Sequence, residues 1–152
     1  MLQGTGLSLV HVGGGDDASL VMIRAHADSC GVGLWIAPRL PSPELVKLMR
    51  DSRAVVSMAH AESFGLTPIE AFAVGIPALF VDEGGFQETL IDGVNGRLLP
   101  RGNYSAWHSA LEQAADSGTR AVWAEAGWAR IAEMDLSPDA HSHRLESILD
   151  SL

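Results

Sequence analysis

Residues 54–81 read AVVSMAHAESFGLTPIEAFAVGIPALFV, and this stretch sets the pattern for most of the chain. Two apolar runs, 54–58 and 78–81, are short enough for strands, and the segment 67–74 between them suits a helix. Gly75 directly follows that segment, where a glycine commonly ends a helix. A strand, a crossover helix and a second strand predict a βαβ unit with parallel strands.

The rest of the chain continues this alternation before it becomes helical. We expect further strands at 7–12, 34–37 and 96–99, and helices over about 16–30, from 43 onward, 85–91, 104–115, 120–134 and 138–149. The run 7–12 reads as a strand buried on both faces. The pattern predicts an α/β fold: a Rossmann-like, three-layer α/β/α domain with a mostly parallel sheet. A single domain over 1–152 would comprise an α/β core at 7–101 and a helical tail at 103–152.

Charge and cysteine content exclude several classes of function. The chain has 10 Lys and Arg against 19 Asp and Glu, a net charge of −9, which argues against a nucleic-acid or polybasic membrane surface. A phosphate ligand stays possible, because backbone amides at a helix start bind anions without a lysine. Cys30 is the only cysteine, so no internal disulfide or cysteine-cluster zinc site can form. No run reaches the ~18 apolar residues of a transmembrane segment. We expect a cytoplasmic protein. We also expect that it has no metal cofactor.

The loops after the strands are the expected ligand site, since ligands of parallel sheets bind beyond the carboxyl ends of the strands. Three loops, 13–17, 59–67 and 82–86, would share one mouth. Within the second loop, Thr67 is a good N-cap, and Glu70 three residues later would complete a capping box. Helix capping alone therefore accounts for these two residues without any ligand.

The same segment also suits a ligand that carries both phosphates and hydroxyls. Gly65 lets the backbone approach a ligand closely, and the amides from Gly65 to Thr67 could hold a diphosphate at the helix start. Glu70 could accept hydrogen bonds from a vicinal diol such as a ribose, and Glu62 could reach a second polyol. A nucleotide sugar combines these groups.

The segment 62–77, with seven residues between Glu62 and Glu70, closely resembles the donor-site signature of retaining GT-B glycosyltransferases, in particular family 4. The resemblance extends through 81–88 and 92–100, and back through 12–15 and 39–41, so it covers about residues 7–101. The motif at 62–77 is specific to this family, whereas the glycine loops alone would be weak evidence for it.

The resemblance implies a metal-free site for a nucleoside diphosphate sugar and a role for each matched position. Glu62 would contact the donor sugar hydroxyls at the catalytic centre, Glu70 would bind the ribose, and Arg39 and Leu40 would lie beside the base. The remaining sugar and diphosphate contacts are expected from Gly13, Gly14, His60, Phe64, Gly65, Leu66 and Thr67. Transfer with retention would then rest mainly on positioning and on stabilising the leaving phosphate.

The family pattern also contains parts that these residues do not match. A complete GT-B enzyme has a second, acceptor-binding domain, and its donor domain opens with a strand and helix that carry an Arg and a Lys, whereas Lys47 is the only lysine here. We therefore expect a truncated or split enzyme that is inactive alone, needs an acceptor domain or partner chain, and can self-associate through an open sheet edge. The alternatives are a non-catalytic nucleotide-sugar binding module and a related epimerase. A dinucleotide site is disfavoured because 13–18 lacks the G-x-G-x-x-G spacing.

Overall fold

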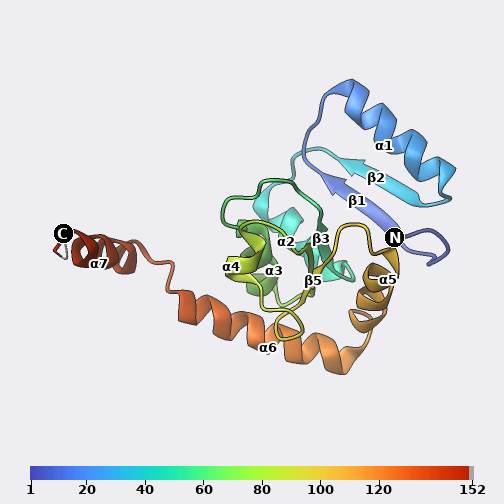
Figure 1. Cartoon of the computed structure of the whole chain (residues 1–152). Helices are drawn as coiled ribbons and strands as arrows, with labels where there is room; N and C mark the ends of the chain where they lie inside the picture. The colour runs from blue at the N-terminus through green and yellow to red at the C-terminus, as the bar shows by residue number, and fades with distance from the viewer. Residues whose placement is uncertain (151–152) are drawn as a thin grey trace.

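The computed structural model describes residues 1–150, in which strands and helices alternate as far as the last strand (Figure 1). The strands are β1 (Ser8–Val12), β2 (Gly33–Ala37), β3 (Val55–Ser57), β4 (Ala78–Val81) and β5 (Arg97–Leu99). The helices are α1 (Asp17–Ser29), α2 (Ser42–Asp51), α3 (Leu66–Val74), α4 (Phe86–Thr89), α5 (Tyr104–Gln113), α6 (Ser117–Met134) and α7 (Pro138–Leu149). The predicted α/β class is confirmed, while the single-domain organisation stays a prediction.

All strand pairs in the described residues are parallel, but they form two separate sheets. β1 pairs with β2, and β4 lies between β3 and β5. The sequence led us to expect one sheet. It also predicted that the run 7–12 is buried on both faces, and this is wrong, because β1 is only half-buried or exposed along its length. β1 has a hydrogen-bonded strand on one side only, so its apolar side chains lack part of their cover.

The core surrounds the three-stranded sheet. All four residues of β4 are fully buried, as expected for a strand with neighbours on both edges. β4 contacts both α3 and α5, so helices cover the middle strand. Phe80 and Phe86 stack at a tilt with their ring centroids 4.8 Å apart. Trp107 of α5 is fully buried and belongs to the same apolar cluster.

The helix ends follow local chemistry in most places. Asp16 caps α1 by accepting a hydrogen bond from the amide of Ser19 at 2.9 Å. α3 differs from the prediction. It begins at Leu66, and the N-cap residue before it is Gly65, in the left-handed conformation (φ +84°). Because glycine has no side chain, the N-cap residue itself supplies no capping hydrogen-bond acceptor to the helix. The predicted capping box of Thr67 and Glu70 is therefore wrong, because both residues already lie inside the helix.

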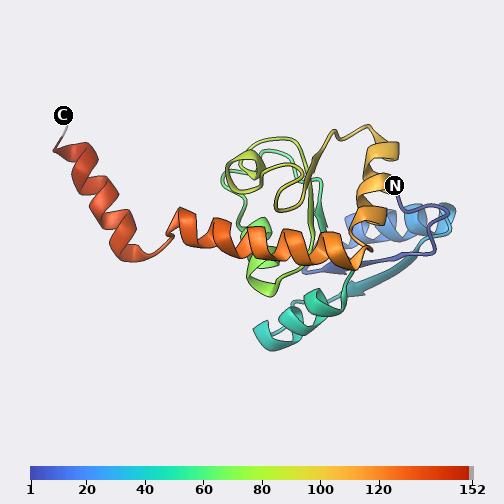
Figure 2. The same cartoon turned by 90° about the horizontal axis from the view of Figure 1, so that it is seen from below.

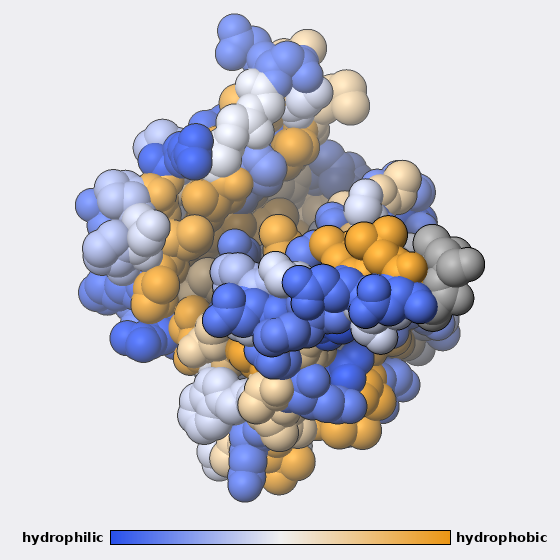
Figure 3. All heavy atoms as spheres, turned by 90° about the vertical axis from the view of Figure 1, so that its left-hand side faces the viewer, coloured by the Kyte–Doolittle hydropathy of each residue, from blue (hydrophilic) through white to orange (hydrophobic). Residues whose placement is uncertain are grey.

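The C-terminal helices run along the molecule and then leave it. α6 packs against α3, and Figure 2 shows α6 lying alongside the α/β part while α7 projects away from it. Apolar side chains are exposed on the face seen in Figure 3, which looks onto the α7 side of the molecule. In α7 and the segment before it, Leu136, Leu145 and Leu149 are exposed. None of the helices within residues 1–150 is long and apolar enough to span a bilayer.

Candidate functional site

Two loops meet backbone to backbone at the carboxyl ends of β3 and β4. The amide of Gly85 donates a hydrogen bond of 2.8 Å to the carbonyl of Glu62. A Cβ at Gly85 would lie 2.3 Å from the backbone nitrogen of Phe64, and one at Gly65 would lie 3.1 Å from the carbonyl oxygen of Gly85. Neither loop can therefore carry a side chain at these two glycines without moving the other. This contact confirms that the loops 59–67 and 82–86 lie side by side.

Glu62 holds the turn that leads into α3. Its Oε1 atom accepts hydrogen bonds from the amides of Gly65 at 3.1 Å and Phe64 at 3.4 Å. The carboxylate, rather than Thr67, thus satisfies backbone donors ahead of the helix. The Gly65 amide that we expected to be free for a diphosphate is occupied in this state. Oε2 of Glu62 has no hydrogen-bond partner among residues 1–150.

The first turn of α3 presents the remaining free amides of this segment. The amides of Leu66 and Thr67 have no acceptor within the helix, because they precede the first intrahelical hydrogen bond. Thr67 and Glu70 are three residues apart, so they share one face of α3, and both line one large cavity. Leu66 is 62% exposed, which leaves the helix start open to a ligand.

Arg101 joins both loops, and the sequence analysis did not single it out. Its guanidinium donates two hydrogen bonds to the carboxylate of Glu83, at 3.0 and 2.7 Å, and others to the carbonyls of Met58 at 2.6 Å and Ala59 at 3.3 Å. The hydrogen bonds from Arg101 lower the pKa of Glu83 below its ordinary value. No local motif marks this role, since Arg101 is 18 and 43 residues away in sequence from Glu83 and Met58.

The other expected site residues lie at different places. His60 is exposed, and its Nδ1 lies 3.7 Å from the carboxylate of Glu83. Gly13, at the end of β1, donates to the carbonyl of Ala37 at 3.3 Å. Four other expected site residues make no hydrogen bond or ion pair with the loop 59–67 in the described part of the chain; they are Gly13, Gly14, Arg39 and Leu40.

No group of three or more His, Cys, Asp or Glu side chains within residues 1–150 is arranged to hold a metal ion. The metal-free character of the site stays a prediction.

Comparison with known protein families places most of the chain in one family. Residues 2–130 match the family described as "Glycosyl transferases group 1". The chain is 36% identical over 130 residues to the D-inositol 3-phosphate glycosyltransferase of Paenarthrobacter aurescens, an alignment that covers 80% of this chain and 29% of the relative. It is 34% identical over 110 residues to the alpha-1,3/1,6-mannosyltransferase alg2 of Schizosaccharomyces pombe, covering 71% of this chain and 21% of the relative. The chain thus spans between a fifth and a third of the length of these relatives.

Solved structures share the fold at low sequence identity. HepE from Anabaena in complex with UDP-glucose matches 95% of this chain with a TM-score of 0.79 and 20% identity, over 41% of its own chain. Sucrose-phosphate synthase from Thermosynechococcus elongatus matches 95% of this chain with a TM-score of 0.79 and 23% identity, over 38% of its own chain. These likenesses show the fold.

Proposed function

Because the chain belongs to the group 1 glycosyl transferases, we propose that it forms the nucleotide-sugar donor site of a retaining glycosyltransferase. The observation that carries this proposal is the start of α3. There the amides of Leu66 and Thr67 lie between two carboxylates, Glu62 before the helix and Glu70 inside it. A relative in fold, HepE, has been solved with UDP-glucose, a ligand of the chemical class that such a site suits.

In this proposal the diphosphate lies at the N-terminus of α3. The amides of Leu66 and Thr67 donate to its oxygens, and the helix dipole favours its negative charge. As the bond between the sugar C1 and the phosphate oxygen breaks, negative charge grows on the leaving diphosphate, and the same amides stabilise it. The acceptor oxygen attacks C1 on the face from which the diphosphate leaves, so the configuration is retained.

The two glutamates have separate roles in this proposal. Oε1 of Glu62 already accepts hydrogen bonds from the amides of the turn. Oε2 is therefore the atom that accepts a hydrogen bond from a sugar hydroxyl. Glu70, which is exposed, accepts from the ribose diol. The proposed contacts of His60 with the sugar and of Arg39 and Leu40 with the base stay predictions.

The chain is proposed to need a further polypeptide for sugar transfer. Its alignments reach only 29% and 21% of the two relatives described above, and acceptor binding has no counterpart among the residues assigned here. A non-catalytic nucleotide-sugar module, or one subunit of a split enzyme, is therefore the second candidate. Sugar transfer by the purified chain alone would exclude that candidate and would also contradict the proposed need for a further polypeptide. The expected cytoplasmic location also stays a prediction.

The proposal is tested by calorimetric titration of the chain with UDP, GDP and ADP, with and without EDTA. We expect saturable binding of one nucleotide that EDTA does not change. In Glu70→Gln the binding should be at least about tenfold weaker, because a hydrogen bond to a charged group contributes about 1.5–3 kcal/mol. Glu125→Gln on the exposed side of α6 removes the same charge elsewhere and should bind like the original chain. Equal loss in both variants, or no binding to a folded chain, contradicts the proposal.

A further inference from the structure

Arg101 extends from a fixed point just after β5. Leu99, the last residue of β5, pairs with Val81, and its carbonyl accepts a hydrogen bond from the amide of Asp82 at 2.9 Å. The side chain of Arg101 is 30% exposed, and that of Glu83, which it binds, is 42% exposed. Ion pairs with this much exposure contribute little to stability. The pair with Glu83 therefore does not by itself account for the geometry of Arg101.

Two of the four hydrogen bonds of Arg101 go to a different loop from the one that carries Glu83. The guanidinium donates to the carbonyls of Met58 and Ala59, where the chain leaves β3, as well as to the Glu83 carboxylate. A guanidinium is planar and has five N–H donors, so one side chain can bind a carboxylate and two carbonyls at once. Arg101 thus fixes the direction in which the chain enters the loop 59–67.

Ala61 adopts a strained conformation between this anchor and Glu62. Its φ of +55° lies in the left-handed region, which is unfavourable for a residue with a Cβ. Such a backbone persists only where its surroundings hold it. Here Arg101 holds the carbonyls of residues 58 and 59, and the Gly85 amide holds the carbonyl of Glu62 at 2.8 Å. Releasing the first anchor lets Ala61 relax to a negative φ, and this rotation turns the Glu62 side chain.

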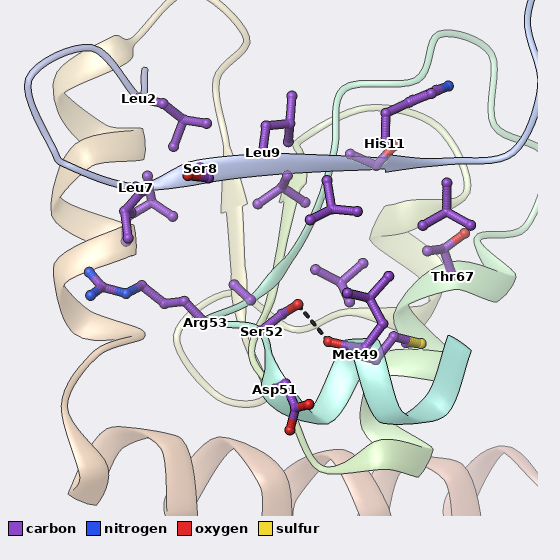
Figure 4. A pocket seen from close by; sticks show the side chains of 18 of the residues that line it. Leu2, Leu7, Ser8, Leu9, His11, Met49, Asp51, Ser52, Arg53 and Thr67 are labelled. Atoms are coloured by element: carbon purple, nitrogen blue, oxygen red, sulfur yellow. Dashed lines mark hydrogen bonds between the residues drawn. The ribbon is translucent and has the colours of Figure 1, made fainter. Parts of the chain in front are cut away.

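The other glutamate of the candidate site has different surroundings. Glu70 lies inside α3 and, with Thr67, lines the cavity of about 870 Å³ between β1 and β3. Figure 4 shows this cavity, with β1, which carries His11, on one side and Thr67 of α3 on the other. Glu62 and Arg101 lie outside its lining. A change at Arg101 therefore moves the loop of Glu62 and leaves the helix of Glu70 in place.

We propose that Arg101 is a positioning residue for sugar recognition, which fixes the entry into the loop 59–67 and so directs Oε2 of Glu62 toward a hydroxyl of the donor sugar. Arg101 acts through Glu62 and touches no part of the donor itself. This inference rests on the proposed function and adds to it a residue that favours the sugar rather than the nucleotide. Loss of the guanidinium should therefore weaken the binding of a nucleotide sugar more than the binding of the nucleotide.

The first test is calorimetric titration of the full chain with UDP and with UDP-glucose, the ligand in the HepE structure, or with the GDP or ADP pair if the chain selects that base. In Arg101→Met the affinity for UDP-glucose should fall about tenfold, and the affinity for UDP by no more than about twofold, because one hydrogen bond from the sugar to a charged acceptor is lost. Arg101→Lys keeps the charge but not the planar set of donors, and it should show the same selective loss. Arg97→Met is the matched control, because Arg97 also belongs to the β5 segment but binds Asp92 and Gln113.

The second test needs no nucleotide. The amides of Gly65 and Gly85 both donate to Glu62, so their hydrogen exchange reports how firmly this residue is held. The exchange of Leu79 in the buried strand β4 corrects for any change in global stability. Relative to Leu79, both amides should exchange about tenfold faster in Arg101→Met than in the original chain. In the control variant their relative exchange should stay unchanged.

Three results overturn the inference. The first is a fall by the same factor in the affinities for UDP and UDP-glucose in Arg101→Met. The second is full UDP-glucose affinity in Arg101→Lys, because charge alone would then be sufficient. The third is unchanged relative exchange of Gly65 and Gly85. If the original chain binds no nucleotide, the proposed function fails; faster exchange in Arg101→Met then still supports the positioning of Glu62, whereas unchanged exchange overturns that as well.

Discussion

The contact between the two site loops makes Gly85→Ala the most informative single substitution. Gly85 has an ordinary helical backbone conformation (φ −62°, ψ −12°), so alanine adds no backbone strain. The added Cβ would lie 2.3 Å from the nitrogen of Phe64 and 2.5 Å from its Cα. It must retreat by about 1 Å to reach the 3.4 Å of an ordinary contact, and the obstacle is backbone, which cannot rotate away. The loop 62–65 must therefore move.

We expect Gly85→Ala to destabilise the fold by about 1–3 kcal/mol, the usual cost of overpacking. Since ~1 kcal/mol shifts the Tm of a domain this size by roughly 2–4 °C, thermal unfolding by circular dichroism detects the change. Nucleotide binding should fall as well, because the displaced loop carries Glu62 and the start of α3. Gly102→Ala is the matched control, since no atom lies within 4 Å of its added Cβ. A Gly85→Ala Tm within about 1 °C of this control would refute the close packing of the loops.

The remaining predictions concern contacts that position the loops and helices. Arg101→Met should lower Tm at neutral pH, and by less in acid below the lowered pKa of Glu83. Arg101 lowers the pKa of Glu83, so the stability from this pair is present above the ordinary glutamate pKa and is lost as the pH falls through the lowered pKa. Equal Tm differences between variant and original chain at both pH values would contradict this. Trp107→Phe removes the 3.0 Å hydrogen bond from a fully buried indole and should cost about 1–3 kcal/mol in urea unfolding. Asp116→Ala removes the N-cap of α6 and should cost about 0.5–2 kcal/mol, whereas an unchanged urea midpoint would argue against the cap.

The elements that local chemistry specifies could be predicted closely. β4 and α7 have the predicted bounds, and Gly75 ends α3 in the left-handed conformation. The start of α3 could not be predicted from its own residues. Thr67 is a good capping residue in isolation. In the structure, however, Glu62 accepts a hydrogen bond from the amide of Gly65, and the helix begins one residue before Thr67.

The arrangement of the site depended on contacts that are distant in sequence. His60 was predicted to contact the sugar, and in the structure its Nδ1 lies 3.7 Å from Glu83, which Arg101 binds from the end of β5. The pairing of Arg101 with Glu83 cannot be recognised in the sequence, because exposed acidic and basic residues are common and most of them lie in solvent. Only the meeting of the ends of β3, β4 and β5 selects this pair.

Residue order and local patterning were sufficient for the α/β class, for most strand and helix positions, and for the segment 62–70 that marks the family. Hydrophobic periodicity and glycine placement act over a few residues, so the sequence alone expresses them. The division into two sheets, the role of Arg101 and the cavity between β1 and β3 emerged only from the packed structure. An apolar strand reads the same whether one neighbour or two pair with it, because the hydrogen bonds that distinguish these cases join segments far apart in the chain.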